Sequence, residues 1–147
     1  MKIYCVTNDP FLSQELAMQL SPSDHTIELF SDGLAALENI NDNLPDLVMI
    51  DTECDNINSI VLINLVSRDS KFNNTEIHYI TSKSVNDPED FKKQNQVNRI
   101  WPKPANISEI IKFSEEIIKT AYKKSNLTKL KSSYFVFHSG DNCSKKT

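Results

Sequence analysis

The stretch DLVMID, residues 46–51, decides how the rest of the sequence is interpreted. Its apolar side chains follow one another without the alternation of a half-exposed strand, and such a run is typical of a central strand covered on both faces. The run stops at a carboxylate, Asp51. We therefore expect a buried strand whose carboxyl end carries a charged group.

Strand-like and helix-like patterns alternate around this stretch, from residue 2 to about residue 122. The expected strands lie at 2–7, 25–30, 46–50, 76–80 and 97–101. The expected helices lie at 10–20, 32–41, 57–68, 87–95 and 106–123. Five β-α pairs in order predict an α/β protein with a doubly wound five-stranded parallel sheet.

The first and last of these helices carry recognisable apolar faces. Asp9 and Pro10 are suited to the start of the first helix, which then presents Leu12, Leu16 and Leu20 on one side. The last helix opens with a capping-box-like pair, Asn106 and Glu109. Its apolar face, expected to pack on the sheet, comprises Ile107, Ile110, Ile111, Ser114, Ile117, Ile118 and Ala121.

The composition is that of a globular protein of about one domain, with 147 residues, 39% of them hydrophobic and 24% charged. The longest apolar stretch is far shorter than the ~20 residues that cross a bilayer, and the amino terminus does not resemble a signal peptide, so we expect a cytoplasmic protein without a membrane partner. Three cysteines without metal-type spacing predict reduced thiols, neither a disulfide framework nor a zinc site.

Charge is distributed unevenly along the chain. Residues 1–118 hold 9 Lys/Arg against 19 Asp/Glu, whereas residues 119–147 hold 7 Lys and a single acidic residue, Asp141. The acidic body argues against direct nucleic-acid binding by residues 1–118. We expect a domain at 1–123 followed by a basic tail or linker at 124–147, and the segment 133–138 (SYFVFH) is open to interpretation as an edge strand, a docking segment or part of a further domain.

Four polar residues stand where an expected strand gives way to a loop: Asp9, Asp51, Thr81 and Lys103. The carboxyl ends of parallel strands meet at one edge of the sheet, and ligands of open α/β sheets bind there. We therefore expect these four side chains to share one pocket. Each also has a local interpretation, since Asp and Thr commonly cap helices and turns.

The spacing of these residues resembles that of a known family. They are separated by 42, 30 and 22 positions, Lys103 precedes Pro104, and the segment DGLAAL lies at residues 32–37. Together these features resemble the response-regulator receiver domain of two-component signalling, over residues 2–122. The resemblance implies the flavodoxin-like (βα)5 receiver architecture and a signalling domain that is not an enzyme.

The resemblance implies roles for the strand-end residues. Asp51 would be the phospho-acceptor, because a carboxylate can attack phosphorus when positive charge offsets the attacking and incoming groups. Lys103 would pair with a phosphoryl oxygen, and the hydroxyl of Thr81 would move toward the phosphoryl group.

The same resemblance implies a Mg²⁺ cofactor. Asp9 and Asp51 would supply carboxylate ligands, the backbone carbonyl of Glu53 would be a third ligand, and Asn8 would contribute weakly through a water. Carboxylates, a carbonyl and waters form the kind of oxygen ligand set that Mg²⁺ takes in proteins.

The implied partners are a histidine kinase or phosphotransfer protein as phosphoryl donor, and a downstream protein or output domain. The output surface would be formed by the helix at 87–95, the strand at 97–101 and the helix at 106–123, including Lys112 and Lys119. Assembly as a homodimer is left open.

Departures from the family pattern motivate one alternative, and a phosphatase is a second. Asn8 replaces an acidic residue, Glu53 adds charge near Asp51, and Ile100 replaces the usual switch aromatic, with Trp101 one position later. These favour a pseudo-receiver, a protein-interaction module independent of phosphorylation. A phosphatase resembling the haloacid dehalogenases would require a second acid two residues after the nucleophile, which Asp51-Thr52-Glu53 only loosely imitates.

Overall fold

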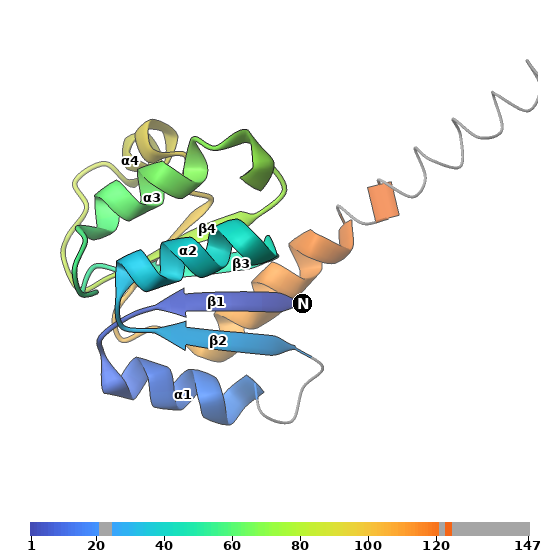
Figure 1. Cartoon of the computed structure of the whole chain (residues 1–147), viewed down its shortest axis with the longest axis horizontal. Coiled ribbons are helices and arrows are strands. Elements are labelled where there is room, and N and C mark those ends of the chain that lie inside the picture. The colour runs from blue at the N-terminus through green and yellow to red at the C-terminus, as the bar shows by residue number, and fades with distance from the viewer. Residues whose placement is uncertain (21–24, 121–122, 125–147) are drawn as a thin grey trace, which may run out of the picture. The chain divides into compact units, whose positions relative to one another are not determined.

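A computed structural model describes residues 1–20, 25–120 and 123–124 of the chain. Five strands form one sheet in the order β2-β1-β3-β4-β5, and every neighbouring pair is parallel (Figure 1). The strands are β1 (Lys2–Val6), β2 (Thr26–Phe30), β3 (Leu47–Asp51), β4 (Glu76–Thr81) and β5 (Arg99–Pro102). The predicted doubly wound five-stranded parallel sheet is confirmed.

Helices follow the strands as the sequence predicts. They are α1 (Pro10–Leu20), α2 (Gly33–Asn43), α3 (Ser59–Ser67) and α4 (Pro88–Asn95), and residues 107–120 and 123–124 are also helical. For most strand and helix ends, the observed bound lies one or two residues from the predicted one. A short 3-10 helix that the sequence pattern did not predict, η1 (Ser70–Phe72), follows Asp69, whose side chain caps it by accepting a hydrogen bond from the N–H of Lys71.

The chain divides into two compact units, Met1–Ile111 and Lys112–Thr147, so the division falls within the last helix. The domain boundary predicted at residue 123 stays a prediction. The segment 133–138, whose role was left open, lies outside the described residues. In the part of the chain that the structure describes, no helix is both long and apolar enough to cross a bilayer.

The first unit buries its apolar side chains in two clusters, one on each face of the sheet. Helices α2 and α3 cover one face, and α1 covers the other (Figure 1). Alternation along β1 sends Tyr4 and Val6 to the α2–α3 side and Ile3 and Cys5 to the α1 side. The α1 side also buries the predicted stripe of Leu12, Leu16 and Leu20, together with Ile107, Ile110 and Ile111.

The central strand behaves as its sequence indicates. All five residues of β3 are buried, including Asp51 at its carboxyl end. The backbone N–H of Thr52 donates to the carbonyl of Ile80 at 2.9 Å, which ties the loop after β3 to β4. Asp51 therefore lies in a well-fixed segment at the edge of the core.

The strand order determines where a ligand can bind. The chain leaves β1 toward one face of the sheet through α1 and leaves β3 toward the other face through α3. Between the carboxyl ends of β1 and β3 the loops therefore diverge, and this switch point is where open α/β sheets form their binding crevice. Asp9 follows β1 and Asp51 ends β3, so both residues lie at this point.

Two of the three cysteines, Cys5 and Cys54, lie among the described residues. Cys5 is buried and Cys54 is partly buried, and neither forms a disulfide. Desolvation raises the pKa of both thiols above the ordinary value, and the charge of Asp51 adds to the effect. Both thiols are therefore held protonated and unreactive at neutral pH.

Gly33, the first residue of α2, lies against the loop that follows Asp51. Its N–H donates to the carbonyl of Asp55 at 2.9 Å, and a Cβ built on it would lie 2.2 Å from the Cγ2 atom of Ile57. Only a glycine fits this approach without a shift of its neighbours.

We expect Gly33→Ala to lower the free energy of unfolding by about 2 kcal/mol, the usual cost of overpacking, as measured by urea denaturation. The double variant Gly33→Ala/Ile57→Ala removes the clashing methyl group. If the clash is the cause, the two substitutions will be less than additive; full additivity would contradict this explanation.

Candidate functional site

Asp51 is the centre of the site. Its side chain is 0% exposed, and both of its carboxylate oxygens are engaged. Oδ2 accepts hydrogen bonds from the hydroxyl of Thr7 and from the ammonium of Lys103, each at 2.6 Å. Oδ1 accepts the backbone N–H of Glu53 at 3.1 Å. These partners satisfy a buried charge that would be costly to hold alone.

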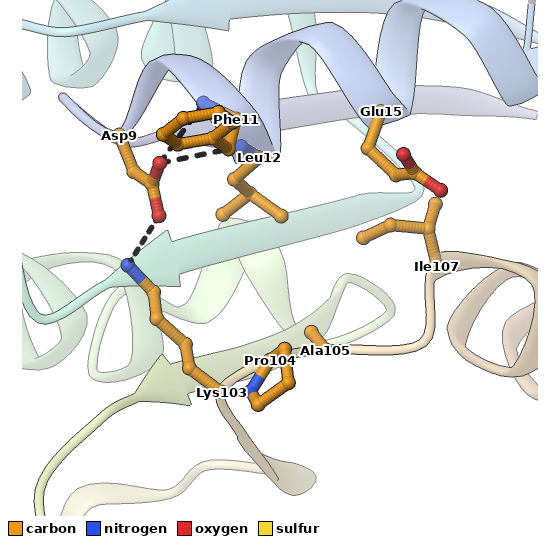
Figure 2. Close-up of a pocket in the computed structure, with 8 residues that line it drawn as sticks. All are labelled: Asp9, Phe11, Leu12, Glu15, Lys103, Pro104, Ala105 and Ile107. Atoms are coloured by element: carbon orange, nitrogen blue, oxygen red, sulfur yellow. Dashed lines mark hydrogen bonds and ion pairs between the residues drawn. The ribbon is translucent and has the colours of Figure 1, made fainter.

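Lys103 joins the two carboxylates predicted to share the pocket. Its Nζ atom lies 2.6 Å from Oδ2 of Asp51 and 3.0 Å from Oδ2 of Asp9, and Figure 2 shows the side chain reaching from the loop after β5 to Asp9. The backbone N–H of Lys103 donates to the carbonyl of Thr81 at 2.9 Å, and this bond fixes the backbone from which the Lys103 side chain extends. The predicted convergence of Asp9, Asp51 and Lys103 is thus observed.

The two carboxylate oxygens of Asp9 have different partners: one caps α1 and the other contacts Lys103. Oδ1 accepts the backbone N–H groups of Phe11 and Leu12, at 3.0 and 3.4 Å, and so caps α1, while Oδ2 pairs with Lys103 (Figure 2). The local role and the site role that the sequence suggested for Asp9 therefore coexist. The cap holds the carboxylate still at the place where Lys103 meets it.

The pKa values of the pair reflect these contacts. The hydrogen bond from Lys103 is the main cause that lowers the pKa of Asp9 below its ordinary value, and the bonds from Leu12 and Phe11 add to it. Desolvation alone would lower the pKa of Lys103, but its hydrogen bonds to Asp51 and Asp9 outweigh burial and raise it. Both groups are charged at neutral pH.

Thr7 belongs to the site but was not among the residues expected there. It follows β1 directly, is 3% exposed, and donates to Asp51 as described above. The sequence held one signal for this role: Thr7 carries a hydroxyl and directly follows the strand-like run IYCV, residues 3–6. Thr is also an ordinary strand former, and its residue type alone did not distinguish the two roles.

Thr81 ends β4 at the same edge of the sheet and is buried, but its hydroxyl is engaged elsewhere. The Oγ1 atom accepts the backbone N–H of Lys83 at 3.0 Å. The predicted movement of Thr81 toward a phosphoryl group would have to break this local bond.

Asn8 and Glu53 flank the two carboxylates. The backbone N–H of Asn8 donates to the carbonyl of Glu53 at 2.8 Å, and the amide of Asn8 donates to Oδ1 of Asp55 at 3.0 Å. A carbonyl oxygen has two lone pairs, so that of Glu53 retains one for a metal. The side chain of Glu53 is exposed, and its carboxylate is not among the groups that bond to Asp51.

The residues present fit a hard divalent cation. One ammonium already contacts an oxygen of Asp9 and an oxygen of Asp51, so these two oxygens lie close enough to share a cation. Across the described residues, no group of three or more His, Cys, Asp or Glu side chains could hold a metal. A set of two carboxylates completed by backbone oxygen and water suits Mg²⁺, which keeps several waters. Lys103 draws on the same oxygens, so it would compete with a bound cation.

A pocket of about 510 Å³ opens beside Asp9 and Lys103 (Figure 2). Its walls are mainly apolar and come from the start of α1 and the chain after β5: Phe11, Leu12, Glu15, Pro104, Ala105 and Ile107. Phe11, at the rim of this pocket, is 81% exposed. The charged centre therefore adjoins an apolar hollow.

Strand alternation separates Ile100 from Trp101. Ile100 packs with the α2–α3 cluster, whereas Trp101 lies on the α1 side and donates from Nε1 to Nδ1 of His78 at 3.0 Å. Trp101 therefore does not occupy the place of an aromatic at position 100. An aromatic from the neighbouring strand lies on that face instead, since Tyr79 pairs with Ile100 in the β4–β5 register.

Tyr79 connects the loop after Asp51 with α4. Its hydroxyl is hydrogen-bonded to the hydroxyl of Thr52 at 3.1 Å, and its ring stacks on Phe91 with centroids 5.2 Å apart and planes inclined by 15°. Thr52 is the next residue after Asp51, and Phe91 belongs to α4. A change at Asp51 thus has a contact route to α4 that does not require an aromatic at position 100.

Solved structures of receiver domains share this architecture. The Francisella response regulator 1452 receiver domain matches with a TM-score of 0.72 at 19% identity, covering 82% of this chain and 98% of that chain. The signal receiver domain of a putative Luxo repressor protein from Vibrio parahaemolyticus gives 0.73 at 15% identity, over 86% and 95%. The Mn²⁺-bound form of response regulator Rcp1 gives 0.63 at 18% identity, over 79% and 90%.

The sequence itself matches no family model and no curated protein. The structural likeness nevertheless establishes that the chain has the fold of response-regulator receiver domains, as its sequence predicted. At these identities the likeness carries the fold and not the chemistry of the site.

We expect Lys103→Gln to lower the free energy of unfolding at neutral pH by about 3 kcal/mol, because it leaves the buried charge of Asp51 without its cation. Urea denaturation of the full chain measures this. The matched control is Lys92→Gln, which breaks an ion pair of 2.9 Å with the exposed Glu89 and should cost less than about 1 kcal/mol. Equal costs for the two variants would contradict the assigned role of Lys103.

Proposed function

We propose that this chain is a phospho-accepting receiver domain that takes a phosphoryl group on Asp51. The observation that carries the proposal is the environment of that carboxylate: it is buried, ionic and contacted by an ammonium at 2.6 Å. Charged donors held in a site of low water content stabilise developing charge without reorganisation. The receiver fold supports the proposal, because ligands of open α/β sheets bind in a crevice at the carboxyl ends of the strands, where Asp51 lies.

The transfer requires no general base. A lone pair of the Asp51 carboxylate forms the new O–P bond, and the bond from phosphorus to the donor's leaving atom breaks with its electron pair on the leaving group. A donor such as acetyl phosphate releases acetate, which needs no proton. The carboxylate of Asp51 pairs with the ammonium of Lys103, so the nucleophile is held in place before the donor arrives.

Lys103 would offset charge during this step. An ammonium has three N–H donors, and two of them contact Asp9 and Asp51. Among the described residues the third has no partner, so it can meet a phosphoryl oxygen. The cap of α1 keeps Asp9 in place while Lys103 shifts between the carboxylates and the incoming group.

Mg²⁺ would be held by the carboxylates of Asp9 and Asp51 and by the carbonyl of Glu53, with Asn8 contributing through a water. When bound, the ion supplies positive charge that offsets both the carboxylate and the phosphoryl group. The Mn²⁺-bound form of response regulator Rcp1 supports a divalent cation at this fold. Asn8 brings no charge, so we expect a weak affinity.

The surface of α4, β5 and the last helix would present the result of phosphorylation to a partner. The donor would be a histidine kinase or phosphotransfer protein, and the recipient a downstream protein or an output domain. Thr81 would follow the phosphoryl group by releasing Lys83, and the contact from Thr52 through Tyr79 to Phe91 gives α4 a second connection to the site.

A second candidate is a receiver-like interaction module that works without phosphorylation. The amide of Asn8 is bonded to Asp55, and Lys103 pairs with both carboxylates, so groups of the protein itself already engage the polar side chains of the site. Such a module would use the same surface in a single state.

The test is incubation of the full chain with acetyl phosphate and Mg²⁺, followed by intact mass measurement. We expect one phosphoryl group on the wild type and none on Asp51→Asn. The matched control is Asp42→Asn, which alters an exposed carboxylate of α2 and should be labelled like the wild type.

Labelling of Asp51→Asn to the wild-type level would overturn the assignment of Asp51. A wild type that gains no mass, together with no calorimetric Mg²⁺ binding below ~10 mM, would favour the phosphorylation-independent module.

A further inference from the structure

Three hydrogen bonds fix Thr7 beside Asp51. Its backbone N–H donates to the carbonyl of Phe30 at 2.8 Å, and its Oγ1 atom accepts the backbone N–H of Asp9 at 2.9 Å. The same Oγ1 lies 2.6 Å from Oδ2 of Asp51. The side chain is 3% exposed, so water does not compete for these bonds.

These contacts fix the direction of the hydroxyl proton. An ionised carboxylate only accepts hydrogen bonds, and an N–H group only donates. Oγ1 therefore accepts from Asp9 and gives its single proton to Asp51. Thr7 thus connects the start of α1 to one chosen oxygen of the buried carboxylate.

The two oxygens of Asp51 become inequivalent as a result. Oδ2 accepts two hydrogen bonds of 2.6 Å, one of them from a charged donor. Oδ1 accepts one bond, from the backbone N–H of Glu53 at 3.1 Å. Short and charge-assisted bonds draw electron density from the oxygen that accepts them, so Oδ1 keeps the more available lone pair.

We propose that Thr7 is a positioning residue that anchors Oδ2 of Asp51 and leaves Oδ1 as the oxygen that receives the phosphoryl group. The inference rests on the proposed function and adds to it the identity of the attacking atom. Oδ1 forms the bond to phosphorus, and the bond to the leaving group breaks with its electron pair on that group. Oδ2 becomes the carbonyl oxygen of the acyl phosphate and continues to accept the proton of Thr7, which is never transferred.

The anchor matters because attack on phosphorus needs an aligned oxygen. Without Thr7 the carboxylate would retain the contacts with Lys103 and Glu53 but could rotate toward another donor. A misplacement of about 1 Å can cost roughly 100-fold in rate. The threonine hydroxyl therefore contributes orientation, although it does not touch the donor.

The kinetic test compares Thr7→Val, which keeps the shape and removes the hydroxyl, with Thr7→Ser, which keeps the hydroxyl. In the presence of Mg²⁺ and acetyl phosphate we expect Thr7→Val to be phosphorylated about 10- to 100-fold more slowly than the wild type, and Thr7→Ser within about threefold of it. A folded Thr7→Val at the wild-type rate, or a Thr7→Ser as slow as Thr7→Val, would overturn the proposal.

A second measurement does not depend on phosphorylation or on the folding of Thr7→Val. A hydroxyl proton buried in a bond of this length should exchange slowly and give a resolved NMR signal in the wild type, assigned to Thr7. That signal should be lost or strongly shifted in Asp51→Ala. If the wild type shows the signal but gains no phosphoryl group, the proposed function fails while the contact between Thr7 and Asp51 stands; a Thr7 signal unaffected by Asp51→Ala would overturn the contact itself.

Discussion

The charge of the buried Asp51 carboxylate is the constraint on which the site depends. An ionised group removed from water is costly unless its oxygens are hydrogen-bonded and its charge is offset. Thr7, Lys103 and the backbone N–H of Glu53 meet this requirement together. The contacts that stabilise the buried carboxylate of Asp51 are also those that would prepare it to react.

Sheet topology explains how residues so distant in sequence meet. The strand order places β1 beside β3, and the loops after these two strands diverge to opposite faces of the sheet. Asp9 enters the resulting crevice as the cap of α1, and Lys103 enters it from the loop after β5. A helix cap, a strand end and a loop thus supply the charged groups, and each is fixed by ordinary backbone hydrogen bonds.

Much of this arrangement could be predicted from the sequence because apolar runs report burial and their ends report the edge of the sheet. Asp9, Asp51 and Lys103 were expected to meet for that reason. Thr7 was missed, since the direction of its hydroxyl depends on a tertiary contact with β3. The hydroxyl of Thr81 is expected to move toward a phosphoryl group, which stays a prediction; in the structure its oxygen accepts the N–H of Lys83, a local bond that residue type and spacing do not reveal.

The most direct measurement of the central claim is a double-mutant cycle between Asp51 and Lys103. The free energy of unfolding would be determined in urea for the wild type, Asp51→Asn, Lys103→Gln and the double variant. A buried ion pair predicts a coupling of about 2 kcal/mol or more. A coupling within about 0.5 kcal/mol of zero, as for an exposed pair, would contradict the account.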